Sequence, residues 1–175
     1  QIIKLVHVFV SLGVRKLRIT GGEPLLRPNL PDLIRQLKLI DGLKEIALTT
    51  NGILLASMAN DLKQAGLDRL TVSLDSLDEE VYRKMTGTRG QLKDVLKGID
   101  VAQLVGFESL KINCVVQRGV NDHTVLEMVK HFKETAHILR FIEYMDVGNQ
   151  NHWNYSKVVP SNELISQINN TYPLQ

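Results

Sequence analysis

Short strand-like runs alternate with longer amphipathic runs along the whole chain, and this alternation limits the possible folds more than any other feature. The predicted strands are Lys16–Thr20, Glu45–Thr50, Arg69–Leu74, Leu110–Val116 and Ile138–Met145. Segments with helical spacing lie between or after them: Asp32–Ile40, Leu55–Gln64, Glu79–Met85, Leu92–Leu104, Thr124–Thr135 and Asn162–Asn169. Repeated strand–helix units are typical of parallel strands joined by right-handed crossovers.

The first four predicted strands each have an apolar face and a polar face, because successive side chains of a strand point to opposite sides. The apolar face carries Leu17, Ile19, Ile46, Leu48, Leu70, Val72, Leu74, Ile112, Cys114 and Val116. The opposite face carries Lys16, Arg18, Thr20, Ala47, Thr49, Asn51, Thr71, Ser73, Asp75, Lys111 and Asn113. In the fifth strand, both faces are mixed.

The polar face decides between two architectures. A doubly wound sheet has helices on both sides and is apolar on both sides. A polar, partly cationic face therefore indicates a lumen that holds an anionic ligand at the carboxyl ends of the strands. We predict an α/β fold: a partial TIM-like (β/α) barrel of about five parallel strands with outer helices. An open sheet with one solvated face is the alternative.

Composition excludes several classes of function. The 175 residues contain 21 Lys and Arg against 19 Asp and Glu, a net charge of +2 that gives no reason to expect a nucleic acid or a membrane as partner. No apolar run approaches the roughly 20 residues that span a bilayer. The single cysteine, Cys114, cannot form an internal disulfide or a cysteine-ligated metal site. We expect a cytoplasmic location and no metal ligand in this chain.

Both ends of the sequence lie in or beside helical segments. Positions 2, 5, 6, 9 and 12 of the opening apolar run share one helical face, and the chain ends just after another helix-like segment. We therefore expect a central piece of a longer protein, with one partial barrel domain over residues 1–175. Unpaired sheet edges of such a piece favour association.

Polar loops follow the first three strands. They are Thr20-Gly21-Gly22-Glu23-Pro24, Thr49-Thr50-Asn51-Gly52 and Ser73-Leu74-Asp75-Ser76. Adjacent glycines allow a positive φ and let a ligand approach the backbone, and a carboxylate such as Glu23 accepts hydrogen bonds from an ammonium group. A plain strand-to-helix turn is the alternative interpretation of the two glycines.

The run from Lys16 to Pro24 resembles the Gly-Gly-Glu-Pro motif of radical S-adenosylmethionine enzymes. Later runs resemble one family of that superfamily, the GTP 3′,8-cyclases of molybdenum cofactor biosynthesis, in the same order: Thr49–Gly52, Ser73–Asp75, Lys111–Val116 and Arg140–Met145. The resemblance extends over essentially the whole chain.

The resemblance implies a set of ligand contacts. For S-adenosylmethionine, the implied contacts are Gly22, Ser73 and Met145, with Gly21 and Glu23 shaping the pocket for its methionine end. For the substrate GTP, they are Arg18, Thr49 and Lys111, with Lys16 and Arg140 as helpers. Lys16, Arg18 and Lys111 suit a triphosphate.

The resemblance also implies a radical rearrangement of GTP that needs two [4Fe-4S] clusters in the full-length protein. The cysteines that hold those clusters are not in this sequence. We therefore assign no catalytic or metal-binding residue, and we expect the isolated chain to be inactive. A homodimer is a possible assembly. The alternatives are another radical enzyme, such as a peptide maturase, and a catalytically inert module that binds nucleotide or S-adenosylmethionine.

Overall fold

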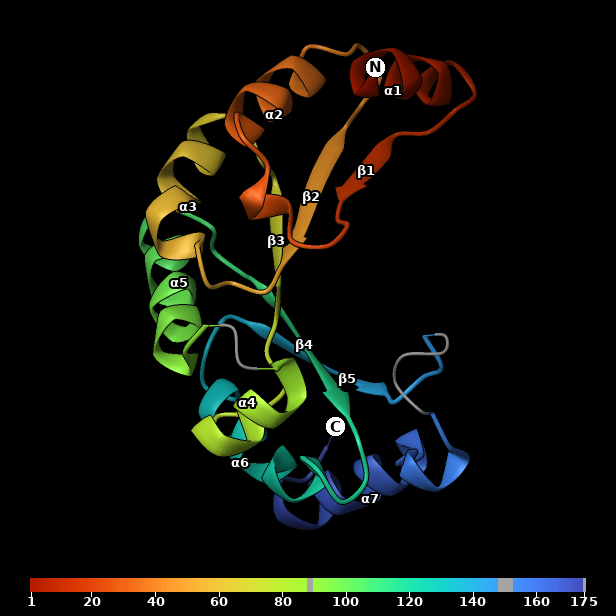
Figure 1. Cartoon of the computed structure of the whole chain (residues 1–175), viewed down its shortest axis with the longest axis vertical. Coiled ribbons are helices and arrows are strands. Elements are labelled where there is room, and N and C mark those ends of the chain that lie inside the picture. Colours follow the sequence, from red (N-terminus) through yellow and green to blue (C-terminus); the bar gives the residue numbers. More distant parts are fainter. Residues whose placement is uncertain (88–89, 148–152, 175) are drawn as a thin grey trace. The chain divides into compact units, whose positions relative to one another are not determined.

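The computed structural model describes residues 1–87, 90–147 and 153–174. The chain divides into two compact units: unit 1 is Gln1–Ser73 with Lys93–Leu110, and unit 2 is Leu74–Leu92 with Lys111–Gln175. Each unit has parallel strands and a buried core (Figure 1).

Unit 1 is built on three parallel strands that pair in chain order: β1 (Lys16–Ile19), β2 (Glu45–Thr50) and β3 (Arg69–Ser73). Its helices are α1 (Ile2–Ser11), α2 (Leu30–Lys38), α3 (Leu55–Gln64) and most of α5 (Leu92–Leu104), and a 3-10 turn covers Pro24–Leu26. Figure 1 shows α2, α3 and α5 on one side of these strands. In the register of β1 and β2, Arg18 lies opposite Ala47.

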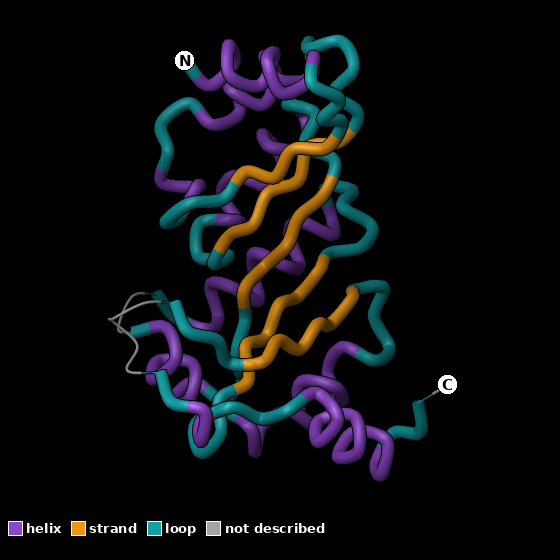
Figure 2. The backbone as a smooth tube through the Cα atoms, turned by 90° about the vertical axis from the view of Figure 1, so that its right-hand side faces the viewer, coloured by secondary structure: helices purple, strands orange, loops and turns teal. Residues whose placement is uncertain are grey.

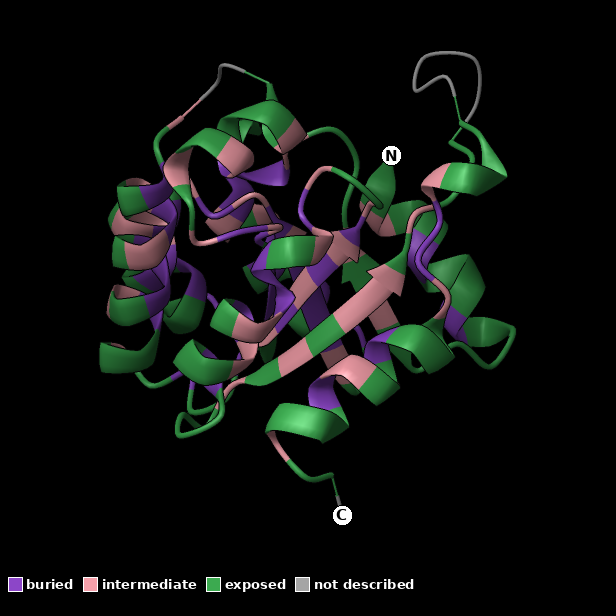
Figure 3. Cartoon of the chain, turned by 90° about the horizontal axis from the view of Figure 1, so that it is seen from below, coloured by how far each residue is buried: buried purple, intermediate pink, exposed green. Residues whose placement is uncertain are grey.

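The core of unit 1 forms where the apolar strand face meets the helices. Ile46, Leu48 and Val72 are completely buried. So are the stripes of α2 and α3 that repeat every three or four residues: Leu30, Ile34, Leu37, Leu55, Ala59 and Leu62. Figure 3 shows the same division, with the buried side of the helices turned inward and the exposed side outward.

Unit 2 contains the parallel strands β4 (Lys111–Val116) and β5 (Ile138–Glu143), which lie side by side (Figure 2). Its helices are α4 (Glu79–Thr86), α6 (Val125–Phe132) and α7 (Ser161–Thr171), and 3-10 turns cover Asp122–Thr124 and Tyr155–Lys157. The Asp78 carboxylate accepts hydrogen bonds from the N–H groups of Glu80 and Val81, which caps α4. An isolated antiparallel bridge joins Gln117 to Val158.

The structure confirms each predicted strand to within one or two residues. In β4 it also confirms the two faces: Ile112, Cys114 and Val116 are buried, whereas Lys111, Asn113 and Val115, which alternate with them, are half-buried. In β2 and β3, Ala47 and Thr71 of the predicted polar face are buried as well. In β5, whose two faces the sequence predicts to be mixed, no residue is buried. The single domain over residues 1–175 stays a prediction.

The structure confirms the helix at the start of the chain, but the apolar face formed by positions 2, 5, 6, 9 and 12 is mostly exposed. The residues at positions 6 and 10 are buried, whereas Leu5, Phe9 and Leu12 of the predicted face are exposed. Lys4, His7 and Ser11 lie on one side of α1, but the apolar remainder is wider than the strip that contains the buried Val6 and Val10, so the sequence does not indicate which part of it is covered.

Candidate functional site

The predicted cofactor turn follows β1 in unit 1. Gly21 has a φ of +145°, a backbone conformation that residues other than glycine rarely adopt. A Cβ added at Gly21 or at Gly22 would meet no atom within 4 Å. The backbone of both glycines is therefore open to a ligand.

This turn lines a pocket of about 350 Å³. The rest of its wall comes from α1, β1, the segment before α2, and α2: Ile2, Val6, Leu17, Arg18, Ile19, Pro24, Arg27, Leu33 and Leu37. The pocket thus combines open backbone polar groups and two arginines with a largely apolar wall, and a mainly apolar lining with a few polar groups is the usual composition of a small-molecule site.

Glu23 holds the end of this turn. Its Oε1 accepts hydrogen bonds from the Leu25 N–H at 3.0 Å and from the Thr50 hydroxyl at 2.6 Å, and its Oε2 accepts one from the Asn51 N–H at 2.7 Å. Both carboxylate oxygens therefore already have donors from within unit 1. The predicted contact between this carboxylate and an ammonium group stays a prediction.

Two of the predicted GTP residues lie together on the polar face of unit 1. Nη1 of Arg18 lies 3.4 Å from Oγ1 of Thr49, and Arg18 is exposed. Lys16 lies at the amino end of β1, where its Nζ is 3.8 Å from a Glu45 carboxylate oxygen. Ser73 is the exposed last residue of β3.

The remaining predicted residues lie in unit 2. Lys111 begins β4, Arg140 lies on β5, and Met145 follows β5 with 52% of its surface exposed. Arg140 and Asn113 are directly opposite each other in the register of the two strands.

Asn113 is a residue that sequence reasoning left out of the candidate site. Its Oδ1 is buried, and within the described part of the chain no group donates a hydrogen bond to it. A buried acceptor without a donor costs free energy, so this atom is suited to accept a hydrogen bond from a ligand. The signal was present in the sequence, because Asn113 has the same strand orientation as Lys111.

A polar cluster in unit 2 joins Asp75 to the end of β4 and to the loop that follows β4. Asn121 is completely buried; its Nδ2 donates to the carbonyls of Asp75 and Val115, each at 2.8 Å, and its Oδ1 accepts from the Gln117 N–H at 2.8 Å. Oδ1 of Asp75 accepts from the Val115 N–H at 2.8 Å. Burial raises the pKa of Asp75, and the hydrogen bond from Val115 partly offsets this rise.

Two further carboxylates fix the start of α7 in unit 2. Oε1 of Glu143 accepts hydrogen bonds from both the hydroxyl and the N–H of Ser161, each at 2.6 Å. Both bonds lower the pKa of Glu143, and the bond from the hydroxyl has the larger effect. Glu163 forms a two-bond ion pair with Arg118, at 2.9 and 2.7 Å, which lowers the pKa of Glu163.

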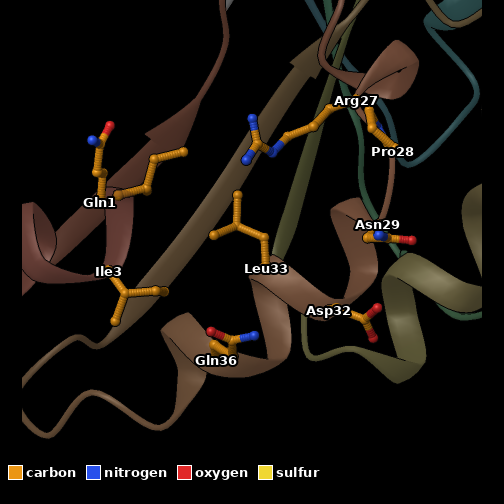
Figure 4. A pocket seen from close by; sticks show the side chains of 9 residues that line it. Gln1, Ile3, Arg27, Pro28, Asn29, Asp32, Leu33 and Gln36 are labelled. Atoms are coloured by element: carbon orange, nitrogen blue, oxygen red, sulfur yellow. The ribbon is translucent and has the colours of Figure 1, made fainter.

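A larger pocket, of about 760 Å³, lies in unit 1 between the start of α1 and the start of α2 (Figure 4). Its polar side chains include Gln1, Arg27, Asn29, Asp32 and Gln36. None of the predicted site residues lines it. Among the residues that the structure describes, no group of three or more metal-ligating side chains gathers anywhere, and no helix is long and apolar enough to cross a membrane.

Cys114 provides a direct test of the predicted strand faces. It is 1% exposed, and burial raises the pKa of its thiol, with a smaller contribution from the nearby Asp75 charge. Since the thiolate is the reactive form, we expect the native protein to resist alkylation at neutral pH and the unfolded protein to react within minutes. The measurement is the labelled fraction over time by mass spectrometry. Rapid labelling of the native protein contradicts the buried position.

Comparison with known proteins places the chain in a family. The model of the radical SAM superfamily matches residues 1–132. A GTP 3′,8-cyclase of Xanthomonas axonopodis pv. citri is 55% identical over 174 residues, which is 99% of this chain and 52% of that protein. A GTP 3′,8-cyclase of Acidothermus cellulolyticus is 47% identical over 174 residues, 99% of this chain and 48% of that protein. The chain thus spans about half the length of the curated relatives it matches.

Solved structures confirm the fold class. Coproporphyrinogen III oxidase (HemN) from Escherichia coli, a radical SAM enzyme, matches with a TM-score of 0.65 at 15% identity, over 97% of this chain and 43% of that chain. Native anSMEcpe with bound AdoMet matches with a TM-score of 0.63 at 21% identity, over 87% and 45%. The family match and these folds agree with the resemblance carried by the Gly-Gly-Glu-Pro turn, and the chain belongs to the radical S-adenosylmethionine superfamily.

Proposed function

We propose that this chain forms the central part of a GTP 3′,8-cyclase, an enzyme that rearranges GTP by radical chemistry in molybdenum cofactor biosynthesis. The observation that carries the proposal is the 55% identity to a GTP 3′,8-cyclase over 99% of the chain. We further propose that the complete protein works in the cytoplasm, forms a homodimer, and has GTP rather than a nucleic acid or a membrane as its partner.

The residues present fit S-adenosylmethionine. Gly21 and Gly22 leave open space beside their backbone, as a closely approaching ligand requires, and Oδ1 of Asn113 is an acceptor without a donor in the described residues. We assign contacts with S-adenosylmethionine to Gly22, Ser73 and Met145. When bound, S-adenosylmethionine supplies the radical chemistry of the superfamily. The role of the turn is to bind and orient its methionine end.

The cationic residues fit GTP. In unit 1, Arg18 and Thr49 are adjacent on the polar face and offer donors to phosphate oxygens. In unit 2, we assign the same role to Lys111, with Arg140 as a helper, and Lys16 is a second helper in unit 1. Arginine suits this role because its guanidinium is always charged and binds phosphate through two donors at once.

The residues of this chain do not fit an iron–sulfur cluster. Cys114 is the single cysteine, and its thiol is buried and protonated. We therefore derive no step through a cluster, and we assign the two expected clusters to other parts of the complete protein. It follows that the isolated chain should show no cyclase activity.

GTP binding by the complete protein tests the proposal. Replacing Arg18 with glutamine removes a charge-assisted hydrogen bond of about 1.5–3 kcal/mol, so we expect GTP binding to weaken about tenfold to a hundredfold. Binding of S-adenosylmethionine should change little. The measurement is equilibrium titration with each ligand.

The matched control is Arg35→Gln. Arg35 is an exposed arginine of α2 that pairs with Asp32 and lines none of the predicted site. If Arg18→Gln and Arg35→Gln bind GTP equally well, the GTP site is wrong. Binding of S-adenosylmethionine alone then favours another radical enzyme, such as a peptide maturase, and binding of nucleotide without turnover in the complete protein favours an inert module.

A further inference from the structure

The Gly21-Gly22 turn has few contacts of its own. Gly21 takes a conformation that residues other than glycine rarely adopt, and a Cβ added at either glycine would meet no neighbour within 4 Å. The turn is held at its carboxyl end by Glu23, which precedes a proline and is fixed in extended conformation at φ −122° and ψ 111°. The position of the two glycines therefore depends on what holds the Glu23 side chain.

Thr50 and Asn51 hold it. These residues lie at the end of β2, and their donors are the Thr50 hydroxyl, 2.6 Å from Oε1, and the Asn51 N–H, 2.7 Å from Oε2. One donor is thus aimed at each carboxylate oxygen. The bonds join the loops that follow two neighbouring strands.

The Thr50 hydroxyl makes the side-chain link of these two, and its direction is defined. Thr50 is 2% exposed, and while its hydroxyl donates to Glu23 it also accepts a hydrogen bond from the Gly52 N–H at 3.1 Å. A hydroxyl has one proton to donate, so the Gly52 bond leaves that proton directed at the carboxylate. The hydroxyl connects the loop after β2 to the turn after β1.

We propose that Thr50 is a positioning residue for S-adenosylmethionine: its hydroxyl, acting through the Glu23 carboxylate, sets the position of the Gly21-Gly22 backbone. This proposal rests on the proposed function. It also gives Glu23 an internal structural role in addition to the predicted contact with an ammonium group.

A pair of variants separates the hydroxyl from the shape of the side chain. Thr50→Val keeps the branched shape and removes the hydroxyl, whereas Thr50→Ser keeps the hydroxyl. In the complete protein, we expect Thr50→Val to bind S-adenosylmethionine about tenfold more weakly with GTP binding unchanged, and Thr50→Ser to restore most of the affinity. The measurement is equilibrium titration with each ligand separately.

Amide hydrogen exchange reports on the link itself. In Thr50→Val, the N–H groups of Leu25 and Asn51 should exchange faster than in the unchanged protein, because the carboxylate that accepts from both is less firmly held. Glu23→Gln provides a second variant if Thr50→Val does not fold. Its amide nitrogen would face one of the donors, so faster exchange of the same two N–H groups is expected, and this exchange is the readout used for this variant.

The outcomes separate this proposal from the proposed function. Faster exchange with unchanged S-adenosylmethionine affinity overturns the positioning role, and unchanged exchange in both variants overturns the link. An equal loss of GTP and S-adenosylmethionine affinity also overturns it, because that pattern indicates general damage. If the unchanged protein binds GTP but not S-adenosylmethionine, both the positioning role and the cyclase assignment fall, even where exchange shows that the link exists.

Discussion

Replacing Asn121 with alanine should lower the free energy of unfolding by at least about 3 kcal/mol. The Asn121 side chain is completely buried and satisfies three backbone groups: the carbonyls of Asp75 and Val115 and the N–H of Gln117. Each buried backbone group left without a partner costs about 1–3 kcal/mol, and the missing side chain also leaves a cavity. The measurement is urea unfolding of the complete protein.

Two further variants show whether hydrogen bonding is the cause. Asn121→Asp keeps the oxygen that accepts from Gln117 but loses both donated bonds, so it should also be strongly destabilised. Asn60→Ala removes an exposed asparagine on α3 and should change the free energy of unfolding by less than about 0.5 kcal/mol. A loss below about 1 kcal/mol for Asn121→Ala would contradict the buried cluster.

The strands and their faces were predictable because burial leaves a direct mark on the order of residues. In β4, Ile112 and Cys114 alternate with Lys111 and Asn113, and alternation with a period of two identifies both the strand and its buried side. The helix over residues 2–11 was equally clear, but its buried side was not. Apart from its polar positions Lys4, His7 and Ser11, this helix is apolar over a wider arc than the part that is covered, so the pattern does not indicate which part of that arc is buried.

The contacts that hold the candidate site were not predictable, because they join residues far apart in the sequence. Glu23 bonds to Thr50 and Asn51, which are 27 and 28 positions away, and nothing in either motif indicates its partner. The sequence identified these residues by type and place: a carboxylate after β1, and small polar groups after β2. Which of them bind a ligand and which bind one another depends on distances that only the structure provides.

Carboxylates that follow strands have a common role in both units. Glu23 comes after β1 and accepts from the end of β2, Asp75 accepts from Val115 of β4, and Glu143 ends β5 and accepts from Ser161 at the start of α7. In each case an acidic side chain near a predicted ligand-binding residue satisfies backbone N–H groups of another element. Part of the polar character at the carboxyl ends of these strands is therefore structural, and residue type alone overstates how much of it contacts a ligand.

Replacing Gly98 with alanine should destabilise the protein although alanine favours helices. In an ordinary helical position this change gains up to about 1 kcal/mol. In α5, however, the added Cβ would lie 2.7 Å from the Gly52 carbonyl oxygen and 2.9 Å from Cβ of Leu55. Neither atom is the flexible end of a side chain, so the backbone must shift, and we expect a net loss of about 2–3 kcal/mol in the free energy of unfolding.

The same variant should weaken binding of S-adenosylmethionine, because Gly52 is the next link toward the cofactor turn. Its N–H donates to the Thr50 hydroxyl, which in turn donates to Glu23. Asp100→Ala, on the exposed side of the same helix, is the matched control and should leave both stability and binding nearly unchanged. Urea unfolding and equilibrium titration measure the two effects separately. A Gly98→Ala protein as stable as the control would show that α5 and the loop after β2 do not pack this closely, and that the cofactor turn is supported from another direction.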